Sequence, residues 1–102
     1  MEAMPVIGRL VRVLRGKAQG GYAVIIGIVD ERFVLIADGD KRRFDDPKKK
    51  SLQHLELLPA VSSEVAGSIE ETGRVTNAKL RYAVQRYTAS GKENDVGERR
   101  RD

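Results

Sequence analysis

Two runs of β-branched and other apolar residues, at positions 7–14 and 22–29, flank a glycine-rich connection at positions 15–21. Residues of this kind favour strands, because their branched side chains pack well on a pleated surface. Glycine adopts positive φ angles at no steric cost, so a connection of this composition and length joins neighbouring antiparallel strands. The beginning of the chain therefore predicts a β-hairpin.

Further short apolar runs continue the pattern. Positions 32–37 form a third run, which the Asp-Gly-Asp sequence at 38–40 closes with a strong turn signal. We expect a fourth strand at positions 41–44 and a fifth within 52–58, ended by Pro59. Five short strands in about sixty residues suit a small, partly open barrel better than a sandwich, which needs more strands. The expected fold class is mainly β.

The second predicted strand is apolar on both of its faces. Successive side chains of a strand point to opposite sides, so the interior of a barrel takes one set and the other set needs separate cover. The first set is Tyr22, Val24, Ile26 and Ile28, and the second is Ala23, Ile25 and Val29.

Two helices after position 60 are expected to supply this cover. Ser62 or Ser63 is suited to cap a helix that reaches about position 71, and Thr76 or Asn77 is suited to cap a second one. Both caps place a side-chain oxygen where it accepts from the unpaired N–H groups of the first turn.

The second of these helices is amphipathic. Its apolar residues recur at helical spacing and form a single stripe, which is wide enough to dock on a sheet. We expect the stripe to pack on Ile25 and Val29 of the second strand. It consists of Leu80, Ala83, Val84 and Tyr87.

The chain of 102 residues divides into three expected parts. At this size one hydrophobic core is expected, and no disulfide or metal is needed to hold it. We expect a barrel at residues 5–59, a helical extension at 60–89 and a disordered charged tail at 90–102. The tail carries the arginine run 99–101 and one apolar residue, Val96, and it cannot bury enough surface to order itself.

The formal net charge of +4 is concentrated in the first half of the chain. Residues 1–58 hold eleven Lys and Arg against eight Asp and Glu, whereas residues 59–102 hold eight against seven. Clustered basic residues are typical of nucleic-acid binding, but many soluble proteins carry them as solvated surface. One cluster is the segment 41–50, and the other is Arg9, Arg12, Arg15 and Lys17.

Cysteine is absent and histidine occurs once, at His54. These counts exclude thiolate zinc sites, iron–sulfur clusters, redox dithiols, cysteine nucleophiles and multi-histidine metal sites. The carboxylate pairs Asp38 with Asp40 and Asp45 with Asp46 stand beside glycine and proline, as turn residues do. We therefore expect a protein that is not an enzyme and has no cofactor and no metal. An enzymatic role that uses His54 is the weakest alternative.

The predicted hairpin resembles the KOW motif, in which apolar strand residues lead into a loop with two spaced glycines and then into a valine-rich strand. Val11 and Val13 match the first strand, Gly16 and Gly20 match the loop glycines, and Val24 matches the second strand. The order of these residues is more specific than a glycine loop alone.

The resemblance continues through positions 34–39 and 47–56 and covers residues 5–59. It is a resemblance to KOW-domain proteins related to archaeal and eukaryotic large-subunit ribosomal proteins, in a form found as short free-standing bacterial chains. It implies an SH3-like five-stranded barrel that binds RNA through the first loop and neighbouring basic segments. The sequence departs from many KOW loops at Gln19, where they place a lysine before the second glycine.

The residues of the loop and of the basic segments agree with this implication. A glycine loop lets backbone amides approach phosphate oxygens, and flanking cations add charge there. Phosphate contacts position a partner without reading its sequence, so shape-selective RNA binding is the expected mode. The expected RNA-binding residues are Arg15, Gly16, Lys17, Gly20, Gly21, Lys41, Arg42, Arg43, Lys48, Lys49 and Lys50.

Three aromatic residues lie in or near these segments. We expect Phe33 to belong to the core and Phe44 to fill the barrel. Tyr22 begins a strand beside the loop, and we expect it to pack against its neighbours, with stacking on a base as the alternative.

These observations predict an RNA-binding KOW protein whose partners are ribosomal RNA and the ribosome. The first residues lack the pattern of a secretory signal, and the longest apolar run, 22–29, is too short to cross a bilayer. We therefore expect a cytoplasmic protein without a membrane partner. The alternative is an SH3-like adaptor that binds proteins with the apolar outer face of its barrel. The sequence leaves the oligomeric state open.

Overall fold

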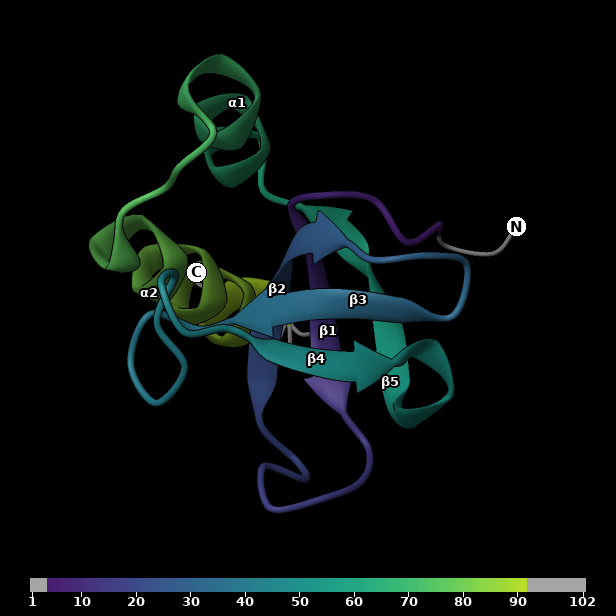
Figure 1. Cartoon of the computed structure of the whole chain (residues 1–102). Coiled ribbons are helices and arrows are strands. Elements are labelled where there is room, and N and C mark those ends of the chain that lie inside the picture. The colour runs from purple at the N-terminus through teal and green to yellow at the C-terminus, as the bar shows by residue number, and fades with distance from the viewer. Residues whose placement is uncertain (1–3, 92–102) are drawn as a thin grey trace.

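The computed structural model describes residues 4–91, and its five strands precede both α-helices (Figure 1). The predicted tail lies outside the described residues from position 92 onward, as do the arginines 99–101. The elements are β1 (Arg9–Val13), β2 (Tyr22–Ile28), β3 (Phe33–Ala37), β4 (Lys48–Ser51), a 3-10 turn (Leu52–His54), β5 (Leu55–Val61), α1 (Ser63–Thr72), α2 (Asn77–Arg86) and a final π-helical turn (Tyr87–Gly91).

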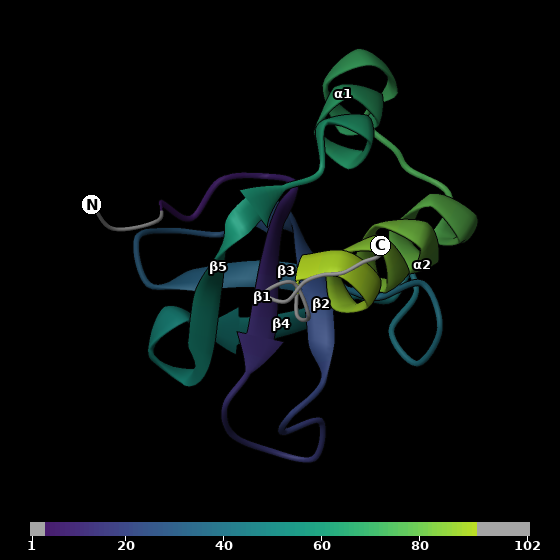
Figure 2. The same cartoon turned by 180° about the vertical axis from the view of Figure 1, so that it is seen from behind.

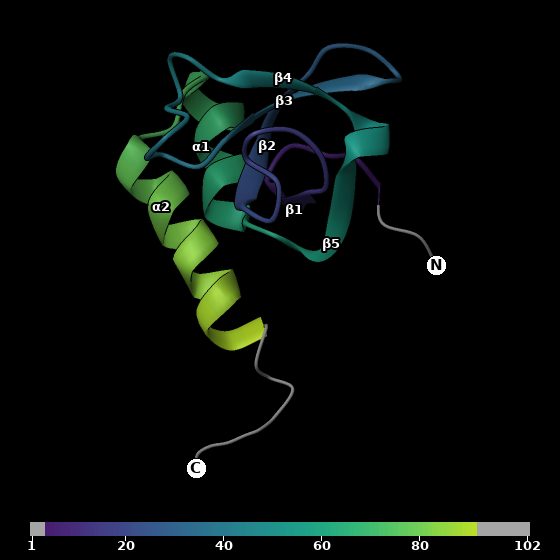
Figure 3. The same cartoon turned by 90° about the horizontal axis from the view of Figure 1, so that it is seen from below.

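The strands form one antiparallel sheet in the order β4-β3-β2-β1-β5. The 3-10 turn joins the two edge strands, and the N–H of Leu14 donates to the His54 carbonyl oxygen at 2.9 Å. The sheet curves around a common centre (Figure 3), but within residues 4–91 no hydrogen-bonded ladder pairs β4 with β5, so the barrel stays open there. The predicted class, mainly β with five strands and a helical extension, is confirmed.

The fourth strand is Lys48–Ser51, and the prediction of a strand at 41–44 was wrong. The cause is the Asp38 carboxylate, whose Oδ1 accepts hydrogen bonds of 2.9 Å from the N–H groups of both Asp40 and Arg42. This side chain closes the backbone into a turn, which satisfies locally the donors that a ladder would have used. The extended strand begins only after the turn has ended.

The fifth strand runs past Pro59 to Val61, although the proline was expected to end it. β5 is an edge strand and pairs with β1 alone, and the register of that pair shifts between Arg9 and Val11. A proline at an irregularity on an open edge removes no hydrogen bond from the ladder. The strand therefore continues.

The inner face of the curved sheet holds the first of two apolar clusters. Val11, Ile25 and Val34 come from three neighbouring strands and are completely buried. This cluster fills the centre around which the strands curve. Its other buried members are Val13, Ala23, Ile36 and Leu55.

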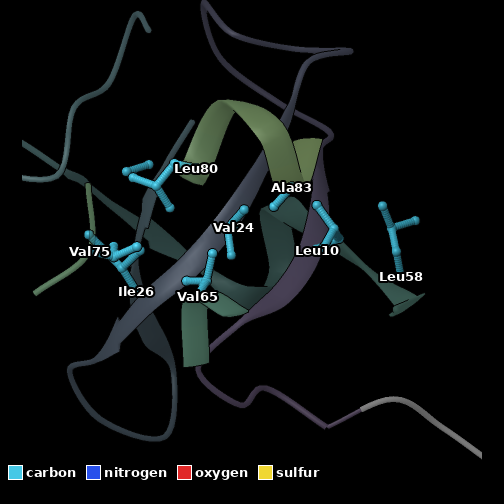
Figure 4. Packing of buried hydrophobic residues seen from close by; sticks show 9 residues of the cluster. Leu10, Val24, Ile26, Leu58, Val65, Val75, Leu80 and Ala83 are labelled. Atoms are coloured by element: carbon cyan, nitrogen blue, oxygen red, sulfur yellow. The ribbon is translucent and has the colours of Figure 1, made fainter. Parts of the chain in front are cut away.

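The second cluster lies between the sheet and the helices, which cover the outer side of β1 and β2 (Figures 2 and 4). Leu80 of α2 and Val65 of α1 are fully buried together with Val24. The predicted helical cover is thus confirmed. Because the helices bury this outer face, it is not available for the protein binding that the adaptor alternative requires.

The face that the helices cover differs from the predicted one. They pack on Val24 and Ile26, whereas Ile25 belongs to the inner cluster. The sheet curls toward the side of Ile25, so the alternate residues of β2 face outward. Val29 lies beyond the end of β2 and is 45% exposed, so it joins neither cluster.

The helix boundaries follow the predicted caps. The Ser62 hydroxyl accepts from the Val65 N–H at 3.1 Å, and the Thr76 hydroxyl accepts from the Lys79 N–H at 3.2 Å. Gly73 ends α1 with a φ of 77°. No helix between residues 4 and 91 is long and apolar enough to cross a membrane.

Candidate nucleic-acid interface

The loop between β1 and β2 is shaped by its glycines. The backbone of Val13 pairs with the far side of the loop: its N–H donates to the Gly21 carbonyl oxygen at 2.8 Å, and its carbonyl oxygen accepts from the Gly20 N–H at 2.7 Å. Gly16 and Gly20 have φ angles of 98° and 90°, in the left-handed region that side chains with a Cβ rarely adopt. The two glycines that match the KOW pattern are therefore the two that the loop geometry requires.

The tip of this loop presents backbone donors. The N–H groups of Gly16, Lys17 and Ala18 have no hydrogen-bond partner among residues 4–91. The carbonyl oxygens of Gly16 and Ala18 are used within the loop, where they accept from Gln19 and Gly21 at 3.0 and 2.9 Å. Consecutive exposed N–H groups favour an anion such as a phosphate oxygen.

β4 connects directly to this loop through Lys50. Its ammonium nitrogen Nζ donates a hydrogen bond of 2.8 Å to the carbonyl oxygen of Arg15. The same atom lies 2.9 Å from where a Cβ would stand on Gly16. The absence of a side chain at Gly16 therefore makes room for this cation.

The turn after β3 forms the third part of the interface, and α2 holds it in place. The Arg81 guanidinium donates to the Gly39 carbonyl oxygen at 2.7 Å, and the Asn77 side-chain oxygen accepts from the Phe44 N–H at 2.7 Å. The exposed ion pair between Arg42 and Asp46 spans 3.7 Å and contributes little to stability. Lys41 and Arg42 are thereby presented from a turn fixed at both ends.

These three segments border one cleft of about 680 Å³. Its floor is apolar and includes Val13, Ala23 and Ile36. Five cations line it against the two carboxylates of Asp38 and Asp40, so its charge is positive. Of the predicted site residues, the cleft brings together Gly16, Lys17, Gly21, Lys41, Arg42, Lys48 and Lys50.

The remaining predicted residues lie outside the cleft. Lys49 points to the opposite face of β4, as strand alternation requires, and its Nζ lies 4.8 Å above the centre of the Phe33 ring. Arg15 borders the loop with an exposed side chain, Gly20 shapes the turn, and Arg43 is exposed beside Arg42.

In the basic cluster formed by Arg9, Arg12, Arg15 and Lys17, the first two arginines have partners away from the cleft. Arg9 donates to the carbonyl oxygens of Met4 and Leu58, at 2.7 and 3.0 Å. Arg12 forms an ion pair of 3.2 Å with Glu56 of β5. Arg9 and Arg12 therefore form their contacts where β1 lies beside β5. Of this cluster, only Arg15 and Lys17 lie beside the cleft.

Phe44 and Phe33 pack differently from the expectation, whereas Tyr22 packs as expected. Phe44 is half-buried against the helix-covered cluster and does not fill the barrel. Phe33 is half-buried under Lys49 and belongs to neither cluster. It begins β3, next to the edge strand β4, where it pairs with Ser51. Tyr22 is half-buried with its ring centre 6.0 Å from that of Tyr87, which agrees with the packing interpretation.

Outside the cleft, the titratable and metal-binding side chains of residues 4–91 form no further site. His54 is half-buried in the 3-10 turn. Within the part of the chain from 4 to 91, no three His, Cys, Asp or Glu side chains gather to hold a metal ion. At the border of the cleft, Asp38 accepts from backbone N–H groups, which is the turn role that its position predicted.

The sequence reasoning missed the residues of α2 that support the site. Asn77 was expected only as a possible helix cap, and Arg81 was given no role. The contact with Gly39 left no separate signal, because a glycine in an Asp-Gly-Asp turn is already explained by its positive φ of 82°.

Comparison with known proteins gives two informative relatives, although no protein-family model matches the chain. A Bacillus subtilis protein named "Putative ribosome-binding protein YbzG" is 49% identical over 71 residues, which cover 70% of this chain and 96% of that protein. The "Large ribosomal subunit protein eL14" of the archaeon Hyperthermus butylicus is 33% identical over 92 residues, which cover 78% of this chain and 89% of the relative.

Both relatives align over most of their own length and over more than two thirds of this chain. The resemblance to KOW-type ribosomal proteins, first apparent in the glycine loop, is confirmed by these identities. The chain belongs to the family of short KOW-like ribosomal proteins that includes these two relatives.

Proposed function

We propose that this protein is a ribosome-associated RNA-binding protein and that it holds ribosomal RNA in the cationic cleft. The observation that carries the proposal is the convergence of three separate segments, the first loop, β4 and the turn after β3, on one positively charged cleft. The names of the two relatives support the ribosome as the partner.

The cleft favours contacts with the RNA backbone. The exposed N–H groups of the loop tip can donate hydrogen bonds to phosphate oxygens, and five cations of the cleft neutralise phosphate charge. These cations are Lys17, Lys41, Arg42, Lys48 and Lys50. Contacts of this kind select the shape of an RNA and carry no sequence code. The role is one of binding, and it assigns the protein to the cytoplasm, where ribosomes work.

Salt titration of binding to ribosomal RNA tests the proposal. If the five lining cations neutralise about four phosphates, the logarithm of the binding constant falls with the logarithm of salt concentration with a slope of about 3 to 4. A matched acidic protein of similar size serves as the control for nonspecific retention. If the protein shows no measurable affinity for ribosomal RNA or ribosomes at low salt, the proposal is wrong.

A further inference from the structure

The N-terminal half of α2 holds the segment that carries Lys41 and Arg42. Two part-buried hydrogen bonds of 2.7 Å join them: Arg81 donates to the Gly39 carbonyl oxygen, and Asn77 accepts from the Phe44 N–H. These bonds lie on either side of the two cations in the sequence. The segment is therefore attached to the helix both before and after them.

The contact between the two segments is direct, backbone against backbone. Gly39 is buried with a φ of 82°, and a Cβ there would collide with the backbone oxygen of Asn77. It would also stand 3.0 Å from the backbone nitrogen of Arg81. A glycine is required at this point because nothing larger fits between the turn and the helix.

α2 is itself anchored to the sheet. Leu80, between the two gripping residues, is completely buried in the helix-covered cluster with Val24. Phe44 packs against the same cluster (the cluster is drawn in Figure 4). All three views of the chain place the turn after β3 beside α2 (Figures 1 to 3). The position of the turn is thus set by the core through the helix.

We propose that Asn77 and Arg81 are positioning residues of the RNA interface, which hold Lys41 and Arg42 at the cleft without contacting RNA themselves. This inference rests on the proposed function. A polar turn held only by its own Asp38 hydrogen bonds would leave the cleft part of the time, so Lys41 and Arg42 would neutralise fewer phosphates there. The helical extension is therefore part of the RNA-binding apparatus.

The substitution Asn77→Ala tests the role without changing any charge. It removes the acceptor of the Phe44 N–H and keeps the Thr76 cap and the buried Leu80. We expect about tenfold weaker RNA binding and a salt slope lower by about 1 to 2, as if two phosphate contacts had been lost. If Asn77 only stabilised the fold, the variant that remains folded would keep the salt slope of RNA binding unchanged.

The matched control is Gln85→Ala, an exposed and uncharged position on the same helix. It is expected to leave affinity and slope unchanged. Asn77→Ser shortens the same acceptor side chain and provides a second uncharged variant if Asn77→Ala does not fold. Exchange of the Phe44 amide proton, measured by NMR, is expected to be faster in either variant.

A combined variant gives the decisive comparison. In a Lys41→Gln, Arg42→Gln background, Asn77→Ala is expected to cause no further loss of RNA affinity, because it acts through those two cations. If the unaltered chain binds RNA with a steep salt dependence and Asn77→Ala binds equally well with the same slope, the positioning role is wrong. If the unaltered chain shows no salt-dependent RNA binding, the proposed function fails, and this role fails with it.

Discussion

The Nζ atom of Lys50 donates a hydrogen bond of 2.8 Å to the carbonyl oxygen of Arg15, across thirty-five positions of sequence. The bond ties β4 to the glycine loop and fixes a cation beside the exposed N–H groups of the loop tip. A lysine whose chain is already ordered loses less conformational entropy on binding an anion. Lys50 is therefore held in place at the cleft before RNA binds. Its neighbour Lys49 points to the other face of β4, because successive side chains of a strand alternate.

Lys50 and Lys49 make a matched pair for the first prediction, since they are neighbours with the same charge on opposite faces of β4. Lys50→Gln is expected to weaken RNA binding and to lower the salt slope by about 1. Lys49→Gln is expected to leave the slope unchanged, because Lys49 covers Phe33 outside the cleft. Fluorescence anisotropy at several salt concentrations measures both. Equal effects of the two substitutions would mean that the cleft is not the binding surface.

The hairpin, the helix caps and the glycine loop could all be predicted from the sequence because local chemistry decides them. Gly16 and Gly20 need positive φ, and Ser62 and Thr76 need only their own first turns. The fourth strand was misplaced for an equally local reason. The Asp38 side chain competes with the sheet for backbone N–H groups, and a propensity reading does not weigh that competition.

The parts that the sequence could not settle depend on long-range packing. Alternation shows that β2 has two apolar faces, but whether Val24 or Ile25 lies inside depends on the direction in which the sheet curls. The first loop and the neighbouring basic segments were predicted to bind RNA, yet the support from Asn77 and Arg81 lies more than thirty positions away from the turn that it holds. Contacts at such separations leave no periodic trace in one sequence.

Leu80 is the residue whose truncation is expected to weaken the fold most clearly. It is completely buried between α2 and the sheet, and replacing it with alanine leaves a cavity. Leu80→Ala is expected to lower the free energy of unfolding by about 2 to 5 kcal/mol. Gln85→Ala on the exposed side of the same helix is expected to change it by no more than about 0.5 kcal/mol. Urea denaturation followed by circular dichroism compares the two, and similar losses would contradict the assigned core.

Asp30 predicts a local pH dependence in the loop between β2 and β3. Its carboxylate accepts hydrogen bonds from the N–H groups of Arg32 and Phe33, at 2.8 and 2.9 Å, and these lower the pKa of Asp30 from its ordinary 3.8. Because the folded pKa is lowered, the stabilisation is present above the unfolded pKa and disappears as the pH falls through the folded one. NMR titration of the Asp30 carboxyl carbon is expected to show a midpoint below 3.8. A midpoint at or above that value would show that the two N–H bonds are absent in solution.

Gly16 and Gly67 predict opposite outcomes for the same substitution. At Gly16, alanine must adopt a φ of 98° and place its Cβ 2.9 Å from Lys50 Nζ, so Gly16→Ala is expected to destabilise the fold by about 1 kcal/mol or more. At Gly67, inside α1, a Cβ meets no atom within 4 Å, so Gly67→Ala is expected to stabilise by about 0.5 to 1 kcal/mol. Thermal unfolding of the two variants measures both signs.

Gly16→Ala is also expected to weaken RNA binding, because it displaces Lys50 from Arg15. A stabilised Gly16→Ala variant would show that the loop does not take the left-handed conformation on which the cleft is built.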